Sequence, residues 1–142
     1  MKEWFECSVE CITEHEQTAS VKREKQNYLI DAMSFTEAEA RMIEKINEFP
    51  RAEYRIKKLN VVKFEDIYDD GDYLKWWKVK ISYKTETDSG KVKNISTISL
   101  VKSDDTESAS RMISEKYKTF LAEWEIKEIK EYNLSDYYPY QS

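Results

Sequence analysis

The chain opens with a strict alternation of apolar and polar residues. Over residues 4–12, one face would carry Phe5, Cys7, Val9 and Cys11. A period of two predicts a half-buried strand. Residues 76–84 repeat the pattern, with Trp77, Val79, Ile81 and Tyr83 on the inward face. We therefore expect two equivalent strands, one in each half of the chain.

Each of these strands is followed by a polar stretch and a second strand. The second strands are expected at about residues 21–32 and 92–102. Between the strands of the second half lies Asp88-Ser89-Gly90, a sequence typical of a hairpin turn. The pattern predicts a β-hairpin in each half.

A helix is predicted after each hairpin. Ser34-Phe35-Thr36-Glu37 has the form of a capping box, and Asp104 through Glu107 repeats it with an aspartate cap. Apolar residues at spacings of three and four follow the first cap: Phe35, Ala38, Met42, Ile46 and Phe49. Pro50 ends this helix. The second helix is expected near residues 105–121.

Third strands should begin at Glu53 and Glu123. In the first of them, Tyr54 and Ile56 share one parity, whereas Leu59 and Val61 have the other. A β-bulge or a bend near Lys57-Lys58 would account for this change of parity.

The two halves are copies of one unit. At an offset of 70 residues, positions 34–68 match positions 104–138 with 11 identities in 35. Residue usage alone would give about two. We therefore expect a single domain, 1–142, made of two repeats, 1–72 and 73–142.

This arrangement predicts an α+β fold built by internal duplication of a strand-strand-helix-strand unit. Two such halves would form antiparallel sheet with two helices around a pseudo-twofold axis. Because about 70 residues bury little surface alone, we expect the copies to share a core.

Composition narrows the possible functions. The 142 residues carry 23 basic and 28 acidic side chains, a net charge of −5. The excess of acid lies in residues 1–72, so a local basic surface in residues 73–142 remains compatible with the sequence. No apolar run is long enough to span a membrane, so we expect no membrane partner. Only two glycines are present, which excludes glycine-rich phosphate loops.

Catalytic groups are scarce. The one histidine, His15, lies among solvated acids in a polar hairpin, and sequence offers it no nucleophile or orienting partner. Cys7 and Cys11 have core-facing parity and lie too far apart along a strand for a disulfide, so we expect buried, reduced thiols. We expect no enzyme activity, no catalytic residues, no cofactor and no small-molecule substrate.

An acidic cluster surrounds Gly71 and consists of Asp66, Asp69, Asp70 and Asp72. Clustered carboxylates can bind Ca²⁺ or Mg²⁺, but the spacing is not that of an EF-hand loop. We expect a solvated acidic linker between the repeats and no metal site.

One candidate binding surface is the outward face of residues 76–84. It would present Trp76, Lys78, Lys80 and Lys84. Aromatic groups and lysines on an exposed sheet suit single-stranded nucleic acid, because bases stack and phosphates pair. The arrangement is also similar in outline to Pur-alpha and Whirly proteins, an analogy of fold alone. The first repeat argues against it, since Trp4 is followed on that face by Glu6 and Glu10. Trp76 could equally be covered by other parts of the chain.

A second candidate surface is aromatic. Tyr137, Tyr138 and Tyr140 lie within five residues, and tyrosine is favoured at protein interfaces. Docking of this segment onto the chain's own core would explain it as well. Together with Trp4 and Trp76, it predicts a surface for a protein partner or for self-association.

Three segments together resemble an uncharacterised family: Trp4-Phe5-Glu6-Cys7, residues 34–41 and the ending Tyr138-Pro139-Tyr140. This family is a domain of unknown function of Bacteroides-type bacteria, their phages and mobile elements. The resemblance covers essentially the whole chain. It implies a cytoplasmic protein of the host cell, or a virion-associated one, and supplies no catalytic residues.

The sequence thus predicts a non-enzymatic binding module. Its first expected role is protein–protein contact or self-association, as an accessory of assembly or host takeover. The alternative is single-stranded nucleic-acid binding on the lysine-bearing sheet face.

Overall fold

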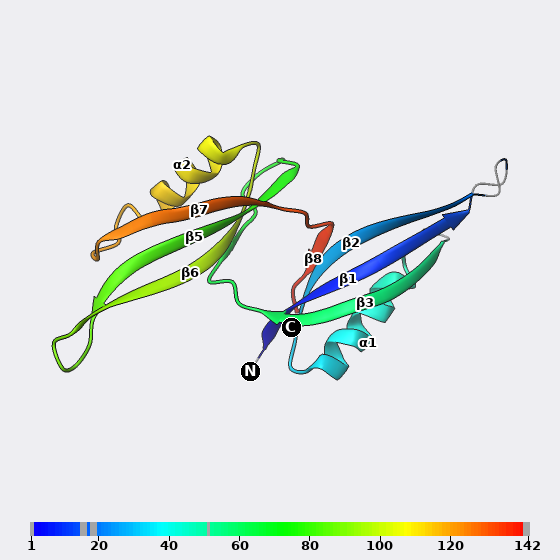
Figure 1. Cartoon of the computed structure of the whole chain (residues 1–142), viewed down its shortest axis with the longest axis horizontal. Coiled ribbons are helices and arrows are strands. Elements are labelled where there is room, and N and C mark those ends of the chain that lie inside the picture. Colours follow the sequence, from blue (N-terminus) through cyan, green and yellow to red (C-terminus); the bar gives the residue numbers. More distant parts are fainter. Residues whose placement is uncertain (1, 15–16, 18–19, 51, 141–142) are drawn as a thin grey trace. The chain divides into compact units, whose positions relative to one another are not determined.

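The computed structural model describes residues 2–14, 17, 20–50 and 52–140. It is an α+β protein with two helices and two four-stranded sheets (Figure 1). The elements are β1 (Glu3–Glu14), β2 (Val21–Ala32), α1 (Phe35–Ile46), β3 (Glu53–Val62), β4 (Ile67–Tyr68), β5 (Lys75–Glu86), β6 (Val92–Ser103), α2 (Thr106–Lys116), β7 (Trp124–Tyr132) and β8 (Asp136–Tyr138).

Two compact units make up the chain. Unit 1 comprises Met1–Lys63 and Asn133–Ser142, and unit 2 comprises Phe64–Tyr132. The sheet of unit 1 has the order β3-β1-β2-β8, and that of unit 2 has the order β4-β6-β5-β7. In each unit one helix lies along one face of the sheet (Figure 1). The expected duplication of one unit is therefore visible as two similar sheet-and-helix arrangements.

Each unit buries its own apolar cluster between sheet and helix. In unit 1, Phe5, Cys7 and Val9 of β1 are fully or almost fully buried together with Met42 of α1. In unit 2, the corresponding cluster includes Val79 and Ile113. The alternation of β1 and β5 thus points its apolar face at the helix, as the two-residue period predicts. We expected the copies to share one core, whereas each of these clusters lies within a single unit.

The units do not coincide with the repeats, because the short strands cross over. The second strand of each unit has a short parallel neighbour at its edge. In unit 2 this is β4, which ends the first repeat and pairs with β6. In unit 1 it is β8, which ends the second repeat and pairs with β2. Each repeat therefore supplies the last strand of the unit formed by the other repeat.

Local signals explain where α1 begins. The Ser34 hydroxyl accepts a hydrogen bond from the Glu37 backbone N–H at 3.1 Å. The Glu37 carboxylate accepts one from the Met33 backbone N–H at 3.3 Å, one residue before the cap. The capping box therefore forms, with its glutamate reaching one residue further back than expected.

The cap of α2 differs from the sequence expectation. Asp105, and not Asp104, caps the helix, because its carboxylate accepts a hydrogen bond from the Ser108 backbone N–H at 2.7 Å. The helix also ends at Lys116, short of the expected residue 121. Leu121 lies beyond it and is fully exposed. The sequence prediction extended the helix to Leu121 because this residue is apolar, but Leu121 is not part of the buried face of the helix.

The bulge expected in the third strand is confirmed. Val9 pairs with Ile56 and Ser8 pairs with Lys58, so Lys57 has no partner on β1. Skipping one residue restores the parity of the strand, and Leu59 then pairs with Cys7 on the helix-covered face. The same irregularity occurs in β7 opposite Lys80 and Ile81.

Candidate binding surface

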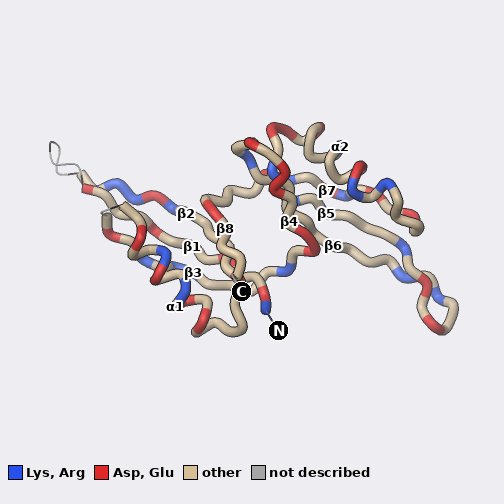
Figure 2. Tube along the Cα trace, turned by 180° about the vertical axis from the view of Figure 1, so that it is seen from behind, with Lys and Arg blue, Asp and Glu red and all other residues tan. Residues whose placement is uncertain are grey.

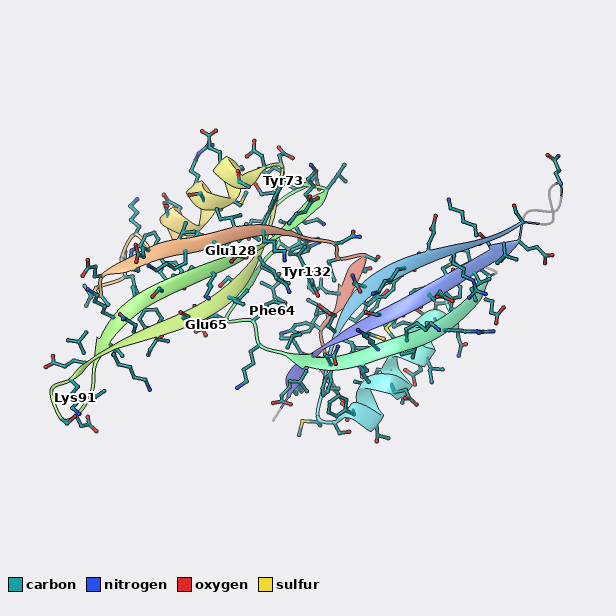
Figure 3. The ribbon with its side chains drawn as sticks, viewed as in Figure 1. Phe64, Glu65, Tyr73, Lys91, Glu128 and Tyr132 are labelled. Carbon is teal, nitrogen blue, oxygen red and sulfur yellow. The ribbon has the colours of Figure 1, made fainter. Side chains whose placement is uncertain are left out.

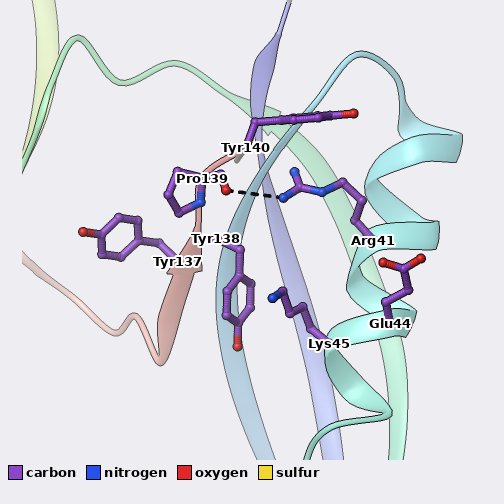
Figure 4. Close-up of a pocket in the computed structure, with 7 residues that line it drawn as sticks. All are labelled: Arg41, Glu44, Lys45, Tyr137, Tyr138, Pro139 and Tyr140. Atoms are coloured by element: carbon purple, nitrogen blue, oxygen red, sulfur yellow. Dashed lines mark hydrogen bonds between the residues drawn. The ribbon is translucent and has the colours of Figure 1, made fainter. Parts of the chain in front are cut away.

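A polar groove in unit 1 lies between β8 and α1. We call it the tyrosine groove (Figure 4). It has a cavity volume of about 330 Å³. Its walls are Arg41, Glu44, Lys45, Tyr137, Tyr138, Pro139 and Tyr140. The helix supplies the charged wall and the last segment of the chain supplies the aromatic wall, so two sequence-distant stretches form one surface.

Arg41 ties the two walls together. Its guanidinium donates to the backbone carbonyl and the carboxylate of Asp31 on β2, the latter at 3.2 Å. It also donates to the Pro139 carbonyl at 3.5 Å (Figure 4). The same guanidinium lies 4.4 Å from the ring centre of Tyr140, a cation–π distance. Arg41 therefore positions the chain after β8 against the helix.

Tyr138 forms the floor of the groove. Its ring stacks on Tyr28 with a centroid distance of 6.0 Å and an interplanar angle of 11°. The Lys45 ammonium lies 5.0 Å from the same ring. Burial, with the charge of Asp136 as a smaller cause, raises the pKa of the Tyr138 hydroxyl to about 12. This hydroxyl therefore stays neutral at physiological pH.

Tyr140 lies at the rim and is more exposed. It has 36% of its surface accessible, and the Lys2 ammonium lies 4.1 Å from its ring centre. A hydrogen bond with Glu37 raises the pKa of the Tyr140 hydroxyl. Two cations therefore lie near a ring that is still 36% exposed, and its accessible part can contact a further molecule.

Unit 2 holds β4 with different charges. Tyr68 donates a hydrogen bond to Asp66 at 3.0 Å, and the Lys116 ammonium lies 5.1 Å from its ring centre. Lys116 also pairs with Asp70 at 3.1 Å. Lys102 on β6 pairs with Asp69 at 3.7 Å. Two of the clustered acids around Gly71 thus lie in ion pairs that secure β4.

No group of three or more histidine, cysteine, aspartate or glutamate side chains within residues 2–14, 17, 20–50 and 52–140 is arranged to hold an ion. Asp69 and Asp70 each pair with a lysine, and Asp66 accepts a hydrogen bond from Tyr68.

The two predicted tryptophans occupy different environments. Trp4 is half-buried and lies 6.4 Å from Tyr137 between ring centres, at an interplanar angle of 59°. Trp76 is 5% exposed, and the Lys102 ammonium lies 5.4 Å from its ring centre. The face of β5 opposite α2 therefore presents its lysines without an accessible indole.

Those lysines lie beside partners. The Lys78 ammonium lies 4.4 Å from the ring centre of Tyr132, and Lys84 pairs with Glu123 at 3.6 Å. Lys80 is exposed and is aligned with Glu128 on β7. Figure 3 labels Tyr132 and Glu128 on that strand, and Figure 2 shows basic and acidic positions interspersed along this sheet. The lysine row is thus partly neutralised by its neighbours.

The cysteines are buried and free, as expected. Burial, with Glu39 as a smaller cause, raises the pKa of the Cys7 thiol to about 11. A thiol with this pKa is protonated at neutral pH and is a poor nucleophile. The expectation for His15 lies outside the described residues.

No helix among the described residues is long and apolar enough to cross a membrane.

Residues 3–140 match the sequence profile of a family described as Domain of unknown function (DUF4494). The chain belongs to this family. The match covers nearly the whole chain, in agreement with the resemblance to an uncharacterised family that its motifs suggested. No curated protein and no solved structure matches the chain.

Sequence reasoning found the tyrosines of the groove and missed its cations. Arg41 and Lys45 are exposed helix positions by pattern, and nothing local marks them as neighbours of Tyr138. Their separation of four residues, which places both on one side of a helix turn, was the available signal.

Proposed function

We propose that this protein is a non-enzymatic binding module that acts by contact with another protein or with a second copy of itself. The observation that carries the proposal is the tyrosine groove. Tyr140 at its rim is 36% exposed, and the cations of Arg41 and Lys2 lie 4.4 and 4.1 Å from the centre of its ring. Tyrosine and arginine are the residue types enriched where proteins bind proteins.

Several contacts also hold the walls of the groove together. Stacking on Tyr28 holds Tyr138, and the bonds of Arg41 to Asp31 and Pro139 hold the segment above it. A surface already ordered in the free protein loses less conformational freedom on binding. This preorganisation supports protein contact as the role of the groove.

A role without catalysis, and without a cofactor or small-molecule substrate, follows from the scarcity of reactive groups. The chain has one histidine and two cysteines, and both cysteines are buried. The resemblance to a family of Bacteroides-type bacteria, their phages and mobile elements supports an accessory role in assembly or host takeover. We place that role in the host cytoplasm or on the virion.

Site-specific photocrosslinking in the bacterial host tests the proposal. A photoreactive phenylalanine analogue at position 140 should form an adduct with a defined protein, identified by mass spectrometry. The purified pair should then lose at least about tenfold in affinity when Lys45→Glu reverses the charge beside Tyr138, because about 1.4 kcal/mol of contact energy is tenfold in Kd.

The control places the same photoreactive group at position 118. Lys118 is exposed, pairs with Glu115 and is not among the residues that line the groove. Equal adduct yields at positions 118 and 140, or an affinity that Lys45→Glu leaves unchanged, would remove the groove from the binding surface.

The alternative is single-stranded nucleic-acid binding on the face of β5 opposite α2. It is favoured by one observation: Lys80 is exposed on that face. Against it stand the 5% exposure of Trp76 and the acidic neighbours of the lysines. Retention on single-stranded DNA that falls steeply with salt and is lost in Lys80→Glu would favour this alternative.

A further inference from the structure

The edge of β2 carries a docking slot for a strand. Three residues of β8 align in parallel with Tyr28, Leu29 and Ile30. Just before them, the Ser135 N–H donates to the Asn27 carbonyl at 2.8 Å. The Asn27 side-chain amide donates to the Asn133 carbonyl at 3.1 Å. We call the edge of β2 from Asn27 to Ile30 the β2 slot.

The occupant of the β2 slot comes from the end of the second repeat. The connection from β7 to β8 consists of three residues, Asn133, Leu134 and Ser135. No covalent continuity joins β8 directly to β2, β1 or α1. The contacts that hold β8 are therefore hydrogen bonds, stacking and cation–π interactions, which any chain with the same segment could make.

Unit 2 shows that the same type of slot recurs. Leu100 on β6 donates its backbone N–H to the Asp66 carbonyl at 2.9 Å, and the Glu65 N–H donates to the Ile98 carbonyl at 2.8 Å. The segments that fill the two slots share an Asp-x-Tyr pattern, Asp66-Ile67-Tyr68 and Asp136-Tyr137-Tyr138. Strand exchange is thus a repeated feature of the fold and not an accident of one edge.

Side chains as well as backbone select the occupant of the β2 slot. Tyr138 stacks on Tyr28 and lies under Lys45, and Arg41 donates to the Pro139 carbonyl. An extended segment lacking the tyrosine would lose the stacking and the cation–π contact together. The slot therefore fits a segment with the sequence of residues 133–140.

We propose that residues 133–140 of a second copy of this chain can fill the β2 slot and produce a strand-exchanged dimer. This inference rests on the self-association branch of the proposed function. The contacts in the slot are the same whether the segment comes from its own chain or from another. Within one chain the short connection gives the segment an effective concentration of about millimolar, which favours the monomer when dilute. Filling of the β2 slot by residues 133–140 of another chain becomes dominant when binding of the chain's own segment is weakened.

Complementation between two full-length variants tests this. The slot variant carries Arg41→Glu and Lys45→Glu, so its own segment 133–140 is intact but poorly held. The segment variant carries Tyr138→Ala and Tyr140→Ala, so its slot is intact but poorly filled. Native mass spectrometry should show a heterodimer in the mixture and monomers for each variant alone.

A matched control replaces the slot variant by Arg111→Glu and Lys118→Glu, which reverses two exposed charges on or beside α2. This mixture should form at least about tenfold less heterodimer, since the control's segment still has its own slot. Equal dimer yields in the two mixtures would overturn the inference.

A labelled peptide with the sequence of residues 133–140 keeps the test decisive if the slot variant fails to fold. The segment variant should bind this peptide at least about tenfold more tightly than a scrambled peptide, measured by fluorescence anisotropy. Wild-type protein should bind it more weakly, because its slot is filled. Equal affinity for both peptides would overturn strand exchange. Crosslinking at position 140 to a different protein would still support the proposed function.

Discussion

Burial decides what the thiols and phenols of this protein can do. Cys7 lies on the helix-covered face of β1 and is fully buried, and burial raises its pKa to about 11 from an ordinary value of 9.0. The buried Tyr28 and the half-buried Tyr117 also have pKa values raised by burial. The folded protein therefore holds protons that the unfolded chain would release at alkaline pH.

This gives a pH dependence with a defined sign. Because the folded-state pKa of Cys7 is raised, its contribution to stability is fully present below pH 9 and is lost between pH 9 and about 11. The free energy of unfolding should fall with pH in this window, with Cys7 contributing a slope of up to about 1.4 kcal/mol per pH unit. Urea titrations of wild type and Cys7→Val at several pH values measure it.

The Cys7→Val substitution should leave the slope due to the tyrosines and remove that of the thiol. Cys11 is also buried, so a Cys11→Val variant measured in parallel separates a specific effect of Cys7 from general repacking of the sheet. Identical slopes in the wild type and Cys7→Val would contradict the assignment.

Residue-level chemistry also distinguishes the two units. The register places Asp31 opposite Trp4 in unit 1 and Lys102 opposite Trp76 in unit 2. The acid pairs with Arg41 on the helix, whereas the lysine pairs with Asp69 after β4. At equivalent positions of the two units, β2 therefore carries an acid and β6 a base, and each forms an ion pair near the short edge strand, β8 or β4.

At the scale of elements, the two helices are shifted by one residue relative to the alignment that sequence identity gives. Identities at an offset of 70 align Met42 with Met112. The buried positions are Met42 in α1 and Ile113 in α2, an offset of 71. The caps, Ser34 and Asp105, have the same offset of 71. The structurally equivalent positions of the two helices are therefore 71 residues apart, although sequence identity aligns positions 70 apart.

This correction makes a direct prediction about capping. Asp105→Ala should lower the free energy of unfolding by about 1 kcal/mol, because the Ser108 N–H loses its acceptor. Asp104→Ala should change it by less than about 0.5 kcal/mol, as expected for a surface substitution. Chemical denaturation of the two variants provides the comparison. A larger loss for Asp104→Ala would return the cap to the position suggested by the repeat.

The strands were the most predictable elements. The second strand, Val21–Ala32, has the bounds expected for it, and the bulge opposite Ser8 and Val9 follows from the change of parity after Ile56. The Asp88-Ser89-Gly90 turn also forms, with Gly90 at a φ of 81°. These features depend on neighbouring residues, so local patterns are sufficient to predict them.

At the scale of the molecule, strand exchange links each repeat to the unit formed by the other. Tyr68 belongs to the first repeat but packs against the cluster of unit 2 with Val79 and Ile113. Tyr138 belongs to the second repeat but packs against the clusters of unit 1. The stability of each unit should therefore depend on residues encoded in the opposite half of the chain.

Hydrogen exchange can detect this crossed dependence. Tyr68→Ala should reduce amide protection in β5 and β6 by about 2 kcal/mol of local stability, through loss of a half-buried aromatic ring. Amides of β1 and β2 should change less. Tyr138→Ala should have the reverse effect. Leu121→Ala, at a fully exposed position, serves as the control and should leave both sets unchanged.

The exchange would be contradicted if Tyr68→Ala reduced protection only in unit 1 and Tyr138→Ala only in unit 2. In that case β4 and β8 would contribute to stability through their own repeats, and the β2 slot would lose its basis.

The sequence alone was enough to predict the class of fold, the duplication, the strands, the bulge and the burial of Cys7. These features depend on periodicity and parity, which are properties of neighbouring residues. The partners of the short strands could not be predicted in this way. β4 and β8 have two and three residues, too few for a period, and their pairing joins segments far apart in sequence. The tyrosine groove has the same origin: Arg41 meets Pro139 only because β8 lies on β2. The two walls of the groove are brought together by backbone pairing between distant segments, and such pairing produces no local pattern in the sequence.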